Sequence, residues 1–90
     1  MDKRTIVKEK VISIIKEIRP DIDLEKEVEL ISDGILESID IVEIVAQLEE
    51  EMGILLPPSE LTEENFKSLE AIVDMAIRIQ GDWYVYNKWV

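Results

Sequence analysis

The residues best suited to chemistry surround one serine, Ser38, which lies between a glycine-containing loop and a patterned helical segment. The eight residues from Asp33 to Asp40 read Asp-Gly-Ile-Leu-Glu-Ser-Ile-Asp. Acids separate a set of apolar residues that recur with helical spacing after Ser38: Ile39, Val42, Val45, Ala46 and Leu48. The pattern therefore places a hydroxyl at the N-terminus of a helix. Such a hydroxyl suits a covalently carried group better than a self-sufficient active site.

A catalytic role for Ser38 lacks the side chains that it would need. Serine becomes a nucleophile when a base such as His or a buried Lys activates it. The chain contains no His, and no Lys lies near Ser38 in the sequence. Cysteine is absent too, which excludes disulfides, thiolate nucleophiles and sulfur ligands. We therefore expect a protein without catalytic residues of its own.

A metal site is also not expected. Asp21, Asp23 and Glu25 alternate as the ligands of a calcium loop do. However, Lys26 lies where such a loop requires glycine, and Ser32 lies where it requires a bidentate glutamate. The resemblance to a calcium loop is therefore accidental.

The net charge of −11 is distributed unevenly along the chain. Residues 1–19 carry six basic and three acidic side chains, whereas residues 20–66 carry fifteen acids and Lys26 alone. The charge argues against nucleic acid as a partner, because its phosphates require Lys and Arg. A one-sided negative surface would steer basic partners, although acids also serve to keep a small protein in solution. The charge thus supports a protein partner without establishing one.

Two long helices are predicted on either side of a long connection. The first follows from apolar residues at three- and four-residue steps: Ile6, Val7, Val11, Ile14, Ile15 and Ile18. Pro20 should end it, because the residue before proline is disfavoured in a helix. The second should run from Ser38 to Met52, with Gly53 as its C-terminal cap.

The connection between these helices, residues 20–36, is expected to be an ordered loop. Its apolar residues can anchor it to the core: Ile22, Leu24, Val28, Leu30, Ile31, Ile35 and Leu36. Gly34 permits a positive φ where the loop bends into the second helix.

The remaining segments predict a short helix and a third long one. Ile54 to Leu56 should form an extended link that plugs the core before Pro57, and a short helix should follow within residues 59–65, with Leu61 and Phe66 facing inward. Ser68 should cap the last helix and Gly81 should end it. Its core face is predicted to hold Leu69, Ile72, Val73, Ala76 and Ile77. The fold class is therefore an all-α bundle of three main helices and one short helix.

The last ten residues differ from the rest of the chain. They hold four of its five aromatic side chains, so we divide the chain into a domain at residues 1–80 and an aromatic tail at residues 81–90. The tail could dock on the bundle, pair with another chain or bind a partner, and the sequence does not choose among these.

Two interpretations of Ser38 compete at this stage. A serine at the start of a helix is usually an N-cap, and its position alone favours that role. A phosphodiester on its oxygen, however, would lie near the free amides and the positive end of the helix. Glu37, Asp40 and Glu43 would then surround the attachment point and face a cationic enzyme.

These residues resemble the acyl carrier protein family, over residues 3–80. The family has an Asp-Ser-Leu-type triplet after a glycine-containing loop, followed by an amphipathic helix that ends in an acidic cluster. Here the triplet is Glu37-Ser38-Ile39, with Glu37 in place of the usual aspartate, and residues 48–54 carry the cluster. The resemblance implies that 4′-phosphopantetheine from coenzyme A is esterified to Ser38 and holds an acyl or aminoacyl group as a thioester. It also implies that Asp40, Glu43 and Glu49 contact partner enzymes.

Residues 61–72 are similar to discrete carriers that a separate adenylating ligase serves, such as the D-alanyl carrier protein. We therefore predict a free-standing, cytoplasmic, monomeric carrier protein, with no membrane partner because no apolar run is long enough to cross a bilayer. Its expected partners are a phosphopantetheinyl transferase, an acid-activating ligase or acyltransferase, and downstream acyl-accepting enzymes. Fatty acid, polyketide and nonribosomal peptide biosynthesis remain open as pathways. The alternative is an acidic helical adaptor that binds basic partners without a prosthetic group.

Overall fold

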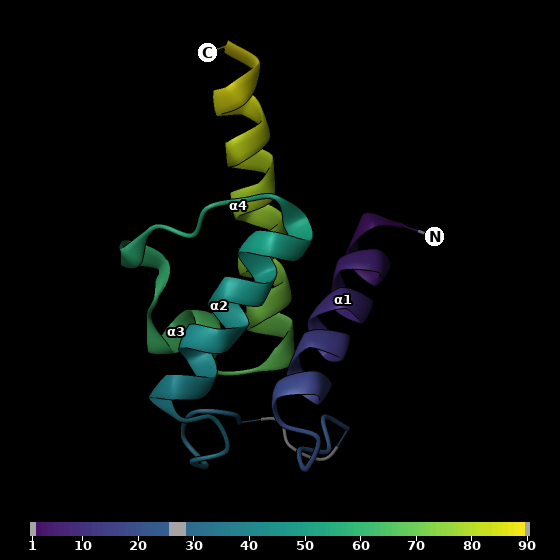
Figure 1. The fold of residues 1–90 in the computed structure, drawn as a ribbon, viewed down its shortest axis with the longest axis vertical. Helices are drawn as coiled ribbons and strands as arrows, with labels where there is room; N and C mark the ends of the chain where they lie inside the picture. Colours follow the sequence, from purple (N-terminus) through teal and green to yellow (C-terminus); the bar gives the residue numbers. More distant parts are fainter. Residues whose placement is uncertain (1, 26–28, 90) are drawn as a thin grey trace.

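The chain folds into a bundle of three long helices with one short helix beside them (Figure 1). The computed structural model describes residues 2–25 and 29–89, and for residues 82–89 it describes the backbone alone. The elements are α1 (Lys3–Ile18), α2 (Ser38–Met52), a 3-10 turn η1 (Pro58–Glu60), α3 (Glu63–Phe66) and α4 (Leu69–Trp89). The described residues contain no strand. The predicted all-α bundle is therefore confirmed.

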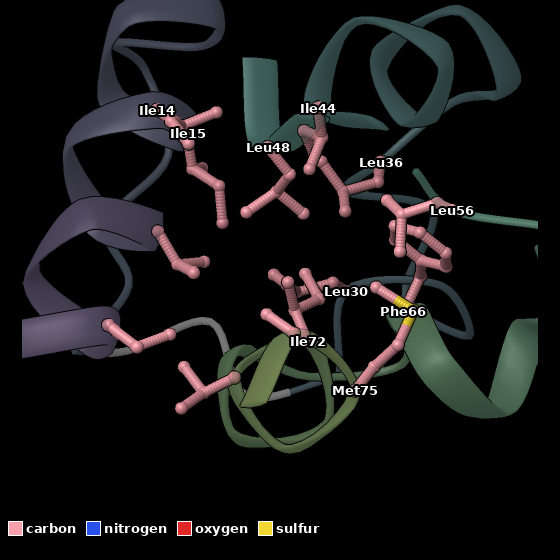
Figure 2. Packing of buried hydrophobic residues seen from close by; sticks show 14 of the residues in the cluster. Ile14, Ile15, Leu30, Leu36, Ile44, Leu48, Leu56, Phe66, Ile72 and Met75 are labelled. Atoms are coloured by element: carbon pink, nitrogen blue, oxygen red, sulfur yellow. The ribbon is translucent and has the colours of Figure 1, made fainter. Parts of the chain in front are cut away.

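One hydrophobic core lies between α1, α2 and α4. Helix α1 packs against both α2 and α4, and α3 packs against α4. Figure 2 shows side chains of the three long helices converging, with Phe66 of α3 and Leu56 on the side away from α1. The largest fully buried side chains are Val11, Ile15, Leu30, Ile44, Leu48, Phe66, Ile72, Val73 and Met75.

Helix α1 follows its prediction closely. The Asp2 carboxylate accepts a hydrogen bond from the Thr5 N–H (2.8 Å) and caps its first turn. The helix ends at Ile18, two residues before the proline. Of the predicted apolar stripe, Ile6 is exposed and Ile18 is half-buried, and the buried part is Val7, Val11, Ile14 and Ile15.

Residues 29–37 of the long connection are held by backbone hydrogen bonds, one of them to the residue that follows α3. The Leu30 N–H donates to the Lys67 carbonyl (2.7 Å), and the Leu36 N–H donates to the Leu30 carbonyl (2.8 Å). Leu30 and Leu36 are buried in the core, as Ile22 is from the first half of the loop. Gly34 has a φ of 71°, so the predicted left-handed bend is confirmed. The predicted anchor Val28 lies outside the described residues.

Helix α2 has the predicted bounds, and Gly53 caps it with a φ of 63°. The predicted apolar stripe is partly wrong. Ile39 and Val42 are each 65% exposed, and Ala46 is exposed as well. The buried face instead consists of Ile44 and Leu48, with Ile41 and Val45 half-buried beside them.

Two apolar stripes run along α2, and each has helical spacing. The stripe that starts at Ile41 faces α1 and the core, while the stripe that starts at Ile39 faces solvent. Spacing alone cannot choose between them, because the choice depends on the angle at which α2 packs on its neighbours.

The link after α2 behaves as predicted up to the short helix. Ile54 and Leu56 are buried and Leu55 points outward. Phe66 is fully buried, but Leu61 is 45% exposed, so its predicted inward orientation is wrong. Leu61 closes the 3-10 turn η1, its N–H donating to the Pro58 carbonyl (3.1 Å). The sequence pattern did not indicate this turn, which changes the direction of the chain just before Leu61.

Helix α4 begins as predicted and extends further than predicted. The Ser68 hydroxyl accepts a hydrogen bond from the Ala71 N–H (3.1 Å), which confirms it as the cap. Gly81 does not end the helix, because it has no positive φ and the helix continues to Trp89. An interior glycine costs only about 1 kcal/mol relative to alanine, and no proline follows it. The side chains of the aromatic tail lie outside the described residues, so its role stays open.

The contact between α1 and α4 includes a carboxylate that should make stability depend on pH. Glu70 forms ion pairs with Lys8 (2.8 Å) and with Arg4. The hydrogen bonds from Lys8 and Arg4 lower the pKa of Glu70 from its ordinary value of 4.5. The folded pKa is therefore below the unfolded one, and this stabilisation is lost as the pH falls through the folded value.

Glu70→Gln should accordingly lower the melting temperature at neutral pH and have a smaller effect in acid. Thermal melts of both proteins between about pH 7 and about pH 3 would measure this difference. A difference in melting temperature that stays constant over the whole pH range would contradict the stabilising role of the Glu70 carboxylate.

Candidate functional site

Ser38 is the first residue of α2, and Glu37 occupies the N-cap position before it. The N-cap interpretation of Ser38 is therefore wrong by one residue. The Ser38 side chain is exposed, and its hydroxyl has no hydrogen-bond partner among the residues that the structure describes. The hydroxyl is thus free for modification, and the fold does not use it.

The backbone around Ser38 provides donors for an anion. The first amides of an α-helix have no intrahelical acceptor, and the partial positive charge of the helix lies at this end. The Glu37 N–H is already taken, because it donates to Oδ2 of Asp40 (2.9 Å). The amides of Ser38 and Ile39 come next in the first turn. An exposed, unpaired hydroxyl beside such amides fits the attachment of a phosphodiester.

The four acids that the sequence associated with partners divide into two pairs. Glu37 and Glu43 are both exposed. Glu37 directly precedes Ser38, and Glu43 lies about one and a half turns after it along α2. Asp40 is buried, with its side chain 8% exposed, and Glu49 accepts a hydrogen bond from the Leu56 N–H (2.9 Å). Asp40 and Glu49 therefore make internal hydrogen bonds, and the Glu37 carboxylate accepts from the Asp40 N–H in a capping box while it remains exposed to solvent, as Glu43 is.

Helix α2 also presents an apolar surface that sequence reasoning assigned to the core. Ile39 and Val42 lie three residues apart, and both are largely exposed beside Ser38. Glu43 lies next to them in the sequence. The sequence does contain a signal for this surface: helix α2 has more apolar residues than one buried stripe requires.

A second residue that sequence reasoning missed, Arg19, connects the end of α1 to the site. Its Nη1 donates to Oδ2 of Asp40 (2.7 Å) and to the Ile35 carbonyl (3.1 Å). Its Nε and Nη2 donate to the two carboxylate oxygens of Asp21 (2.9 and 2.8 Å). The bonds to Asp21 and Asp40 raise the pKa of Arg19 and lower that of Asp21, so both are charged. Figure 1 shows the end of α1 and the start of α2 at the same end of the bundle.

Other kinds of site find little support in the part of the chain that is described. Among the side chains that the structure describes, in residues 2–25 and 29–81, no three acidic residues are grouped so that they could hold a metal ion. Asp21 is paired with Arg19, and Asp23 accepts from the Glu25 N–H (3.0 Å). None of the helices in these ranges is long and apolar enough to span a membrane.

The fold and the site define a helical protein that presents one free serine at a helix N-terminus. Comparison with known families agrees: the model of the phosphopantetheine attachment site matches residues 6–76. The chain belongs to this family, as a member of the acyl carrier type, and it carries covalently attached 4′-phosphopantetheine. No curated protein matches the chain. The family's partners are a phosphopantetheinyl transferase and biosynthetic enzymes in general, and its carrier domains are generally not catalytic.

Proposed function

We propose that this protein carries an acyl or aminoacyl group on a phosphopantetheine arm attached to Ser38, and presents it to partner enzymes. The observation that carries the proposal is the state of Ser38: it is exposed, it starts α2, and its hydroxyl bonds to nothing in the described residues. The arm supplies a thiol that holds the cargo as a thioester. Every catalytic step on the cargo is left to the partners.

The chain's own residues contribute attachment and recognition. The Ser38 hydroxyl supplies the oxygen that is esterified, and the first-turn amides of α2 offer hydrogen bonds to the phosphate oxygens. Coenzyme A is the donor, and a phosphopantetheinyl transferase catalyses the transfer. An acid-activating ligase or acyltransferase then loads the cargo, and an acyl-accepting enzyme removes it. The likeness of residues 61–72 to discrete aminoacyl carriers supports the ligase route.

Partner recognition would use the exposed side of the first two turns of α2. Ile39 and Val42 supply apolar area that a partner can cover, and Glu37 and Glu43 supply negative charge at its edge. Asp40 and Glu49 support this surface through their internal hydrogen bonds.

The test of the proposal is the intact mass of the full chain after incubation with coenzyme A and a broad-specificity transferase. The mass should rise by one phosphopantetheine, and fragmentation should place the addition on Ser38. A mass that does not change under any transferase would overturn the proposal and favour the acidic adaptor. An addition at another residue would overturn the assignment of Ser38.

Replacing Glu43 by Gln should weaken transferase binding through the loss of one exposed charge. We expect KM to rise about two- to fivefold at low salt, the range of a single exposed ion pair, while kcat stays the same. Glu9→Gln on α1 is the matched control, because it removes the same charge from an exposed position on another helix. The difference between the two variants should shrink near 1 M salt, where the Debye length is about 3 Å. An effect of Glu43→Gln that is insensitive to salt would contradict the electrostatic role.

A further inference from the structure

The backbone that surrounds Ser38 is held by a residue that is distant in the sequence. Arg19, the residue after α1, donates from one nitrogen, Nη1, to the Ile35 carbonyl and to Asp40. Ile35 lies three residues before Ser38, and Asp40 lies two residues after it. A single guanidinium nitrogen therefore connects the end of α1 to both sides of the serine.

The Asp40 carboxylate extends this connection to the residue next to Ser38. Its Oδ2 accepts from Arg19 Nη1 and also from the Glu37 N–H, at 2.7 and 2.9 Å. Asp40 is the one charged residue that is buried among the described residues, and Arg19 is its cation, with 28% of the side chain exposed. A charge-assisted network of this kind fixes geometry more firmly than neutral hydrogen bonds do.

The opposite edge of the guanidinium is held as well. Asp21 binds Nε and Nη2 with both carboxylate oxygens, in the fork arrangement that arginine and carboxylate favour. Arg19 is therefore oriented before any partner arrives. Asp21 is exposed, so this edge can be altered without opening the core.

No hydrogen bond orients the Ser38 side chain within the described residues, so its presentation depends on how its backbone is held. The backbone at the start of α2 determines where the Ser38 Cβ lies, and rotation about the Cα–Cβ bond then carries the oxygen among its staggered positions. A core of this size can be built without a buried ion pair, and such pairs are often no more stabilising than apolar residues of the same volume. In this fold the pair joins the end of α1 to the turn that carries Ser38.

We propose that Arg19 is a positioning residue of the attachment site: it ties the end of α1 to the backbone on both sides of Ser38 and so presents the hydroxyl to the transferase. This inference rests on the proposed attachment to Ser38. It adds a residue from the end of α1, outside the triplet and outside α2, to those on which modification depends.

The test compares Arg19→Gln with the wild type in the full chain. We expect kcat for phosphopantetheinylation to fall about tenfold or more, within the roughly hundredfold that a displacement of about 1 Å can cost, while KM changes little. Arg19→Lys should recover only part of the rate, because one ammonium cannot reproduce the fork. Arg4→Gln is the matched control, since Arg4 also bridges two carboxylates, Glu70 and Asp74, away from this site. It should leave kcat unchanged.

Amide exchange of the unmodified protein gives a second measurement that does not depend on any enzyme. The Glu37 amide should exchange about tenfold faster in Arg19→Gln, as expected when a charge-assisted hydrogen bond is loosened. It should not change in Arg4→Gln. If Arg19→Gln does not fold, Asp21→Asn should show the same two effects to a smaller degree.

A folded Arg19 variant with wild-type kcat and unchanged Glu37 exchange would overturn the positioning role. So would a loss of rate that Arg4→Gln reproduces. If the wild type itself is never modified, the attachment proposal fails, and the Glu37 amide alone then decides whether Arg19 orders the turn.

Discussion

Ser38→Ala is expected to abolish phosphopantetheinylation completely while the protein remains folded. The variant removes the oxygen that we propose the transferase esterifies, so intact mass should not change even with prolonged incubation. The free energy of unfolding should change by no more than about 0.5 kcal/mol, because Ser38 is exposed and its hydroxyl makes no hydrogen bond within the described residues. Had Ser38 been the N-cap, the cost would be about 1 kcal/mol.

Ser59→Ala is the matched control for this experiment. Ser59 is also exposed and also lies near the start of a helical turn, in η1, far from the start of α2 along the chain. The Ser59→Ala protein should be modified on Ser38 at the wild-type rate. Modification that persists in Ser38→Ala would remove the attachment assignment, and a large loss of stability would show that the hydroxyl has a structural role.

The sequence was sufficient to predict where helices begin or end, and where the loop bends, at residues with strong local preferences. Pro20 and Gly53 bound α1 and α2, Ser68 begins α4, and Gly34 bends the loop, because each of these depends on the residue's own backbone or its own hydroxyl. Gly81 shows the limit of that logic. Whether a glycine ends a helix or is tolerated inside it depends on the residues after it, and here the helix continues.

The site was only partly predictable, because several of its features depend on packing. Ser38 and the exposed acids beside it follow from the local pattern. The exposure of Val42 and the burial of Asp40 depend on how α2 is rotated against α1, which local spacing does not determine. Arg19 could not be assigned from the sequence, because its partners Ile35 and Asp40 are 16 and 21 residues away.

Phe66→Ala should destabilise the protein more than any surface change considered above. The side chain is fully buried beside Leu56 and Met75 (Figure 2), and α3 is too short to be stable without it. We expect a loss of about 3–5 kcal/mol, out of a total of about 5–15 kcal/mol for a typical domain. The melting temperature should then fall by at least about 12 °C, which thermal melts can measure.

Leu61→Ala is the control for Phe66→Ala, because it truncates an apolar side chain of the same region that is exposed and not buried. Leu61 is 45% exposed, so its truncation should cost less than about 1 kcal/mol.

The Phe66→Ala and Leu61→Ala variants should also differ in how modification depends on temperature. Phe66→Ala should be modified normally in the cold, where it is folded, and should lose modification as it melts, because only the bundle presents Ser38 on an ordered α2. Equal losses of stability in the two variants would show that Leu61 packs inward, and loss of modification in cold, folded Phe66→Ala would connect α3 directly to the site.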